Sequence, residues 1–157
     1  MVNRYAAGNV RCISLAGQMA DDMRIVAYKK AALAAGIAHS KGSLIVRTDA
    51  DCVAPSSWLK HIAAIYEQSS PVMIVAPVIY SSGRRLAEIF QLIDFMSMQG
   101  ITAAAHHMKL GNMSNGANLA FSRAAYEQAE GYKGIDHLAS GDDYLLMMKM
   151  MRHDPAG

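Results

Sequence analysis

A run of six strand-forming residues, SLIVRT (43–48), lies between two segments whose apolar residues recur at helical spacing. The segment before it, residues 22–38, carries a mostly apolar stripe that ends near Gly36, and the segment after it begins at Pro55. A further short strand is predicted at residues 9–15. The order strand, helix, strand is typical of a parallel βαβ unit, in which the helix covers one face of the sheet.

The rest of the chain continues the alternation of strands and helices. The apolar run VMIVAP (72–77) has the length of a central strand, whereas residues 100–116 are rich in Gly and Asn and predict a loop. Three further helices and one strand are predicted, at residues 84–99, 122–130 and 142–151 and at residues 117–121. No internal repeat or linker interrupts this order, so we expect a single α/β domain.

The composition excludes several classes of protein. At 157 residues, 52% of them hydrophobic, the chain is long enough for one sizeable core. Its net charge of +2 comes without a Lys/Arg block, so we expect no nucleic-acid partner. No apolar stretch has the length of a membrane span, and the two cysteines, Cys12 and Cys52, are too few for a zinc cluster or a disulfide framework. A reducing, cytoplasmic compartment fits best.

Two carboxylates, Asp49 and Asp51, follow the strand predicted at residues 43–48. Ligands of open α/β sheets bind beyond the carboxyl ends of the strands. Carboxylates at i and i+2 can divide their work there, one meeting a divalent cation and the other a ribose hydroxyl or an ordered water, because Mg²⁺ and Mn²⁺ prefer oxygen ligands. The alternative is a turn that the two acids merely shape, and this pair by itself does not decide between them.

A second acid pair, Asp142 and Asp143, comes after Gly141 at the predicted start of a helix. Capping a helix requires only one acid, so a doubled acid suits a cation site together with a general base. His106 and His107 are a further candidate metal pair. Adjacent histidines on a regular element point in different directions, however, and exposed loop imidazoles are the favoured interpretation.

Three segments in order carry a resemblance: KKAALAAGIAHSKGSLIVRTDADCVAPSSWL, NGANLAFSRAAYEQAEGY and ASGDDYLLMMKM. Together they resemble the family 2 glycosyltransferases, inverting enzymes of the GT-A fold, over roughly residues 9–151. The resemblance implies a Rossmann-like, mixed α/β sheet flanked by helices and a nucleotide-diphospho-sugar donor, with a UDP-sugar favoured. It also implies Mg²⁺ or Mn²⁺ as cofactor and, as acceptor, a hydroxyl of a polysaccharide, a lipid-linked glycan or a cell-envelope glycan.

The resemblance assigns roles to single positions. By it, Asp51 binds the cation that bridges the donor diphosphate, and Asp49 contacts the ribose or the donor sugar. Lys29 lies near the nucleotide, although Tyr28 and Ala34 stand where the family has Gly and Asn. The segment that lines the donor sugar and acceptor region comprises Asn115, Gly116, Ala117 and Asn118.

Asp143, preceded by Asp142, matches the acidic pair whose second member is the catalytic base of the family. Inversion requires the acceptor hydroxyl to attack the anomeric carbon from the face opposite the diphosphate. A base must therefore remove the hydroxyl proton while a cation stabilises the charge of the departing group. The resemblance gives the first task to Asp143 and the second to the cation on Asp51.

The family pattern also has features that do not occur in this sequence. It begins with a nucleotide-holding strand and a D-D-x-S turn, and it continues past the acid-pair helix to a Q-x-x-R-W segment and often to membrane helices. We therefore expect a truncated catalytic domain with weak nucleotide affinity and little turnover. We expect this domain in the cytoplasm, at the inner face of the cell membrane. A missing C-terminal region would attach it to the membrane. Two alternatives stay open: a non-catalytic module that binds divalent ions or nucleotides, and a metal-dependent phosphoryl-transfer enzyme.

Overall fold

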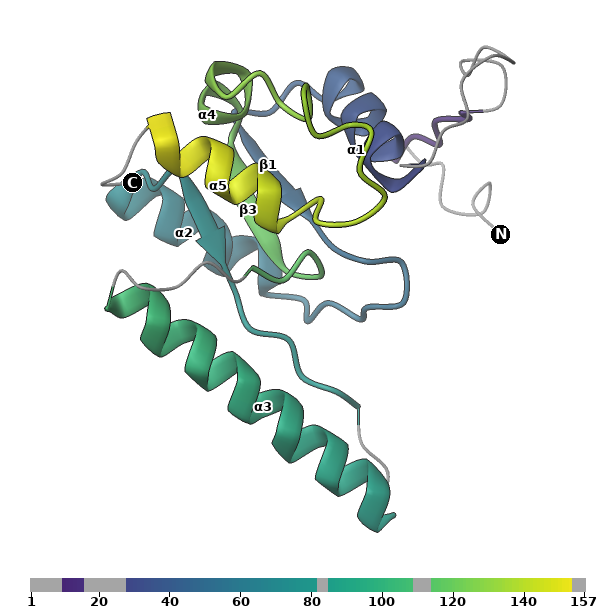
Figure 1. Ribbon diagram of the computed structural model, residues 1–157, viewed down its shortest axis with the longest axis vertical. Helices are drawn as coiled ribbons and strands as arrows, with labels where there is room; N and C mark the ends of the chain where they lie inside the picture. The colour runs from purple at the N-terminus through teal and green to yellow at the C-terminus, as the bar shows by residue number, and fades with distance from the viewer. Residues whose placement is uncertain (1–9, 16–27, 82–84, 109–113, 154–157) are drawn as a thin grey trace. The chain divides into compact units, whose positions relative to one another are not determined.

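The structure is a computed structural model that describes residues 10–15, 28–81, 85–108 and 114–153 (Figure 1). Two compact units divide the chain. The first comprises Met1–Lys41 and Tyr132–Ser140, and the second comprises Gly42–Gly131 and Gly141–Gly157. We call them unit 1 and unit 2. The D-x-D acids, the residues 115–118 and the acid pair Asp142–Asp143 all belong to unit 2.

Unit 2 contains a sheet of three short strands in the order β1-β3-β2. These are β1 (Leu44–Arg47), β2 (Met73–Val75) and β3 (Leu119–Ser122). β3 is the central strand and runs antiparallel to both neighbours (Figure 1). Its residues Leu119, Ala120 and Phe121 are buried, which fits the central place of this strand between two neighbours.

The strand pairing differs from the parallel βαβ unit that was predicted for residues 9–15, 22–38 and 43–48. β1 and β2 do run in the same direction and are joined by α2 (Trp58–Ser69), but β3 lies between them and pairs with each. Residues 10–15 form no strand, and Asn9 lies outside the described residues, so the strand predicted at 9–15 is wrong where it can be tested. The local pattern identified the strands, while a segment distant in sequence determined their neighbours.

α2 begins at Trp58, three residues after the predicted start at Pro55. Of its apolar residues at helical spacing, Ile62 is 3% exposed but Leu59 is 58% exposed, so the apolar face is buried only in part. The helix ends at Ser70, which adopts a left-handed conformation with φ 45° and donates its N–H to the Tyr66 carbonyl at 2.8 Å. Pro71 follows and cannot continue the helix, so the sequence Ser69-Ser70-Pro71 ends α2.

Two helices after β3 complete the core of unit 2. α4 (Arg123–Gln128) is capped by Ser122, whose hydroxyl accepts the Ala125 N–H at 3.1 Å. α5 (Tyr144–His153) buries Leu146, Met147 and Met150, so two methionines of its run LLMMKMM fill the core. The sequence analysis predicted that this helix begins at residue 142, with the acid pair in its first turn. α5 instead begins at Tyr144, so both acids precede the helix.

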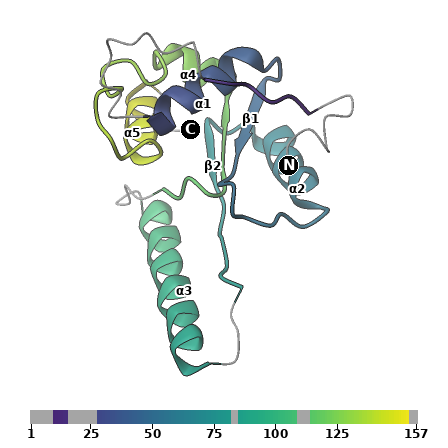
Figure 2. The same cartoon turned by 90° about the vertical axis from the view of Figure 1, so that its right-hand side faces the viewer.

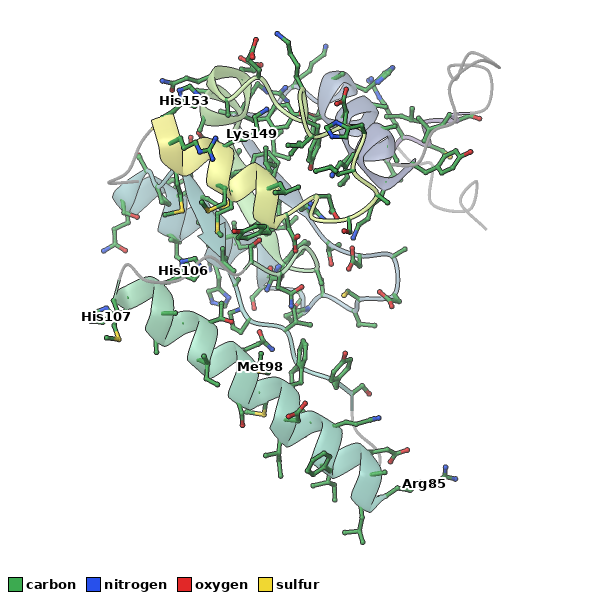
Figure 3. The ribbon with its side chains drawn as sticks, viewed as in Figure 1. Arg85, Met98, His106, His107, Lys149 and His153 are labelled. Carbon is green, nitrogen blue, oxygen red and sulfur yellow. The ribbon has the colours of Figure 1, made fainter. Side chains whose placement is uncertain are left out.

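α3 (Leu86–His107) extends well past its predicted end at residue 99. The segment TAAA that follows Gly100 and Ile101 has a high helix propensity, which outweighs the single glycine. Consequently His106 and His107 lie in the last turn of a helix and not in a loop, and Figure 3 shows their rings pointing in different directions.

α3 lies beside the extended segment that follows β2 (Figure 2). The Gln99 side chain exchanges two hydrogen bonds with the backbone of Val78. The ring centroids of Tyr80 and Phe95 lie 4.4 Å apart. No α3 residue is fully buried. None of the helices in the described ranges combines the length and the apolar character that crossing a bilayer demands.

Unit 1 is organised around a buried lysine on α1 (Tyr28–His39). Lys30 is 1% exposed, and its Nζ donates hydrogen bonds of 2.8 Å to three carbonyl oxygens, those of Ile135, Leu138 and Ser140. The ammonium group has three donors, so these carbonyls satisfy all of them. The residues 22–27 of the predicted helix lie outside the described part of the chain.

Candidate active site

Three loops meet at one edge of the sheet of unit 2. Leu119, the first residue of β3, pairs with Arg47 at the end of β1 and with Val75 at the end of β2. The D-x-D segment begins two residues after Arg47, and residues 115–118 directly precede Leu119. Figure 1 shows the loop after β1 and the loop before β3 leaving the sheet at the same end. The antiparallel register thus brings together two motifs that are more than sixty residues apart in sequence.

Residues 115–118 form a tight turn. The Asn115 side-chain oxygen accepts the Ala117 N–H at 3.0 Å, and the Asn118 N–H is donated to the Asn115 carbonyl at 3.3 Å. Gly116 is buried at the apex and donates its N–H to Oδ2 of Asp143 at 2.9 Å. This bond connects the NGAN turn to the second acid of the acid pair.

Gly116 is a glycine because two side chains approach its Cα closely. A Cβ at this position would collide with Nη2 of Arg47, would lie 3.1 Å from the Arg47 Cζ and would lie 3.4 Å from Oδ2 of Asp143. The close approach of a guanidinium and a carboxylate to one backbone position leaves no room for a side chain.

Arg47 and Asp142 form a buried ion pair that the sequence analysis missed. Nη2 of Arg47 lies 2.5 Å from Oδ2 of Asp142, and the two side chains are 5% and 11% exposed. Within the described ranges, Nε and Nη1 of Arg47 have no hydrogen-bond partner. The signal in the sequence was a charged residue inside an otherwise apolar strand, because a buried charge requires a partner of opposite sign.

Asn118 connects the loops of this edge to each other. Its side-chain oxygen accepts Nε1–H of Trp58 at 2.9 Å, and its side-chain nitrogen donates to the Pro77 carbonyl at 2.8 Å. Its backbone carbonyl accepts the Ala76 N–H at 3.0 Å. The amide predicted to face the sugar is thus engaged by the start of α2 and by the end of β2. Trp58, the one tryptophan of the sequence, was not among the predicted site residues.

The D-x-D acids occupy different environments. Asp49 is half-buried in a turn in which the Cys52 N–H is donated to the Asp49 carbonyl at 3.2 Å. Asp51 is exposed, with its Oδ1 4.0 Å from Sγ of Cys52. In the ranges that the structure describes, no group of three His, Cys, Asp or Glu side chains is placed to hold a metal ion. One exposed carboxylate does fit a cation that takes most of its ligands from water and a substrate diphosphate.

Tyr144 and Gly116 fix the carboxylate of Asp143 from two sides. Oδ1 accepts the Tyr144 N–H at 2.8 Å, and Oδ2 accepts the Gly116 N–H. The side chain is half-buried, so each oxygen keeps further lone pairs for an incoming hydroxyl. Of the predicted site residues, Lys29 belongs to unit 1, where it is exposed on α1 beside the buried Lys30.

Comparison with protein families finds a match to the model of "Glycosyl transferase family 2" over residues 27–128. The matched range contains α1, the D-x-D segment and residues 115–118, and it ends before the acid pair. Searches of curated proteins and of solved structures find no match. The match covers about two thirds of the chain. The chain belongs to glycosyl transferase family 2 and has its GT-A type of α/β fold.

Proposed function

We propose that this chain transfers a sugar, with inversion, from a nucleotide-diphospho-sugar to a hydroxyl acceptor, with Asp143 as the general base and a divalent cation on Asp51. The observation that carries the proposal is the 2.9 Å hydrogen bond from the Gly116 N–H to Oδ2 of Asp143. It joins the acid pair to a turn that directly precedes β3, next to the strand end that bears the D-x-D acids. Base and cation ligand thus belong to one edge of one sheet.

The two bonds to Asp143 support its role as a base. Backbone N–H groups hold the carboxylate in one orientation, so no reorganisation is needed when an acceptor hydroxyl arrives. The carboxylate takes the hydroxyl proton while the oxygen forms a bond to the anomeric carbon and the bond from that carbon to the diphosphate breaks. Asp142 does not compete for this proton because Arg47 already pairs with it.

The donor side of the site is assigned to the D-x-D segment. Asp51 would hold Mg²⁺ or Mn²⁺, which supplies charge neutralisation for the departing diphosphate. Asp49 would accept a ribose or sugar hydroxyl, and Asn115 would face the donor sugar. A UDP-hexose is the donor we favour, and the acceptor is a polysaccharide, a lipid-linked glycan or a cell-envelope glycan.

We also place this activity in the cytoplasm at the inner face of the cell membrane. The support is one face of α3, which exposes Leu86, Phe90 and Ile93 by 86%, 71% and 59% at helical spacing. Such a face can lie in the interface of a bilayer without crossing it. Sedimentation with phosphatidylglycerol vesicles tests this: Phe90→Ser together with Ile93→Ser should abolish binding, whereas Gln91→Ser, on a different side of α3, should not.

Two single substitutions separate the donor role from the base role. Asp51→Asn should remove the Mn²⁺ dependence of UDP-sugar binding measured by calorimetry, while Asp94→Asn, an exposed acid on α3, should leave it unchanged. Asp143→Asn should keep donor affinity within about threefold but lower transfer by at least about a hundredfold, the usual contribution of a general base.

Each alternative function has an outcome of its own in the same experiment. If Asp143→Asn leaves every measured property intact, the chain is a binding module and the proposal is wrong. Release of inorganic phosphate without a sugar acceptor would indicate a phosphoryl-transfer enzyme instead. Donor binding that is the same with and without Mn²⁺ would remove the cation from the mechanism.

A further inference from the structure

We propose that Arg47 is a positioning residue for the base: its guanidinium holds Asp142 and the Gly116 turn together, and through them it fixes the carboxylate of Asp143. The inference rests on the proposed function, because it gives Arg47 a role only through the base. Arg47 does not touch the reacting atoms itself.

One nitrogen of the Arg47 guanidinium, Nη2, lies close to both Asp142 and Gly116. Nη2 of Arg47 lies 2.5 Å from Oδ2 of Asp142, and the same nitrogen occupies the space that a Cβ of Gly116 would take. Gly116 in turn donates its N–H to Asp143. Arg47 therefore contacts the neighbour of the base on one side and the backbone group that orients the base on the other.

The charges explain why a guanidinium is placed there. Asp142 and Asp143 are adjacent carboxylates, and two like charges at this separation repel each other in a partly dry site. Arg47 compensates the charge of Asp142, which is almost entirely buried. This contact makes Asp142 a structural acid and leaves the half-buried Asp143 as the one acid of the pair that can meet a substrate hydroxyl.

Gly141 makes the acid pair dependent on such an outside contact. It adopts φ 73°, a left-handed conformation that favours glycine, and its carbonyl accepts the Leu145 N–H at 3.0 Å. The turn thus starts α5, but its backbone bonds do not determine where the Asp142 side chain lies. Arg47, which extends from β1, a strand remote in sequence, supplies that constraint.

Hydrogen exchange of the Gly116 amide tests the inference without requiring sugar transfer. In Arg47→Gln, Gly116 exchange should accelerate about tenfold or more, as expected for loss of a hydrogen bond to a charged group, and should approach that of Asp143→Asn. The Phe121 amide, in the middle of β3, should keep its protection. Arg152→Gln, at an exposed arginine of α5, is the matched control and should change neither amide.

A double variant keeps the test informative if Arg47→Gln unfolds because the buried carboxylate of Asp142 loses the compensating charge of Arg47. Arg47→Gln with Asp142→Asn removes both charges and should fold, yet its Gly116 amide should still exchange about tenfold faster than in the original chain. Arg47→Lys keeps the charge on a shorter, non-planar group and should restore only part of the protection. Original Gly116 protection in the double variant would show that Arg47 acts only through fold stability, and the inference would be wrong.

Kinetics connects the amide measurement to the reaction. The double variant should lower kcat about as much as Asp142→Asn alone, because residues that act through one another have non-additive effects. Its acceptor KM should stay within about twofold of that of the original chain. Additive losses would contradict the inference even if Asp143→Asn abolishes transfer. If Asp143→Asn does not reduce transfer, the proposed function fails, while the Gly116 exchange rates still decide whether Arg47 holds the turn.

Discussion

The N–H of Gly116 donates a 2.9 Å hydrogen bond to Oδ2 of Asp143. The bond spans 27 positions of sequence and brings the turn before β3 to the residue before α5. It depends on the absence of a Cβ at position 116, because the Arg47 guanidinium fills that space. The glycine is therefore required by the contact and not by an unusual backbone conformation.

Gly116→Ala should accordingly weaken both the fold and the site. The added methyl group must push Arg47 away from Asp142, which we expect to lower the free energy of unfolding by about 1–3 kcal/mol, the usual cost of overpacking. Urea unfolding followed by circular dichroism measures the change. Gly100→Ala is the control: a Cβ there meets nothing within 4 Å in the middle of α3, and alanine should stabilise the helix by up to about 1 kcal/mol.

The sequence predicts the elements of this fold better than their pairing. β1, α2 and β2 follow directly from a strand-forming run, an apolar helical face and a Ser-Ser-Pro stop, all of which are local. The position of β3 between β1 and β2 depends on contacts between segments that are far apart, and no short-range pattern contains that information.

The same distinction separates the predicted from the missed parts of the site. Asp51 and Asp143 were predicted because acids at the end of a strand and before a helix are visible in short motifs. Arg47 was missed because its partner Asp142 lies 95 positions away in sequence. Lys29 was chosen over Lys30 because the carbonyl partners of Lys30 lie 105 to 110 positions away. Long-range pairing of buried charges is decided by the folded chain.

Lys30→Met should destabilise unit 1 far more than Lys29→Met. The first change leaves three carbonyl oxygens without the buried ammonium that they share, at an expected cost of about 2–4 kcal/mol. The second changes an exposed side chain, for which we expect less than about 0.5 kcal/mol. Thermal unfolding and amide exchange at residues 132–140 measure the difference, and equal effects of the two substitutions would contradict the role given to Lys30.

Ser70→Gly should raise stability at the end of α2. Ser70 holds φ 45°, and a residue with a Cβ pays about 1 kcal/mol for that left-handed conformation. Glycine relieves this strain but loses more freedom on folding, so the expected net gain is about 0.5 kcal/mol. Ser69→Gly, one position earlier and still inside the helix, is the opposite control and should lower stability by a similar amount. Chemical unfolding of both variants side by side checks the predicted difference in sign.

Trp58 provides an optical signal from the candidate site, because it is the one tryptophan of the chain and its Nε1–H is donated to the Asn118 side chain at 2.9 Å. Asn118→Ala removes that acceptor and also the donor to the Pro77 carbonyl, so we expect an altered emission spectrum and a loss of about 1–3 kcal/mol in stability. Addition of a UDP-sugar with Mn²⁺ should change Trp58 emission in the original chain and in Gly100→Ala, but not in Asp51→Asn. An emission change of the same size in Asp51→Asn would show that the nucleotide binds away from the D-x-D edge of the sheet.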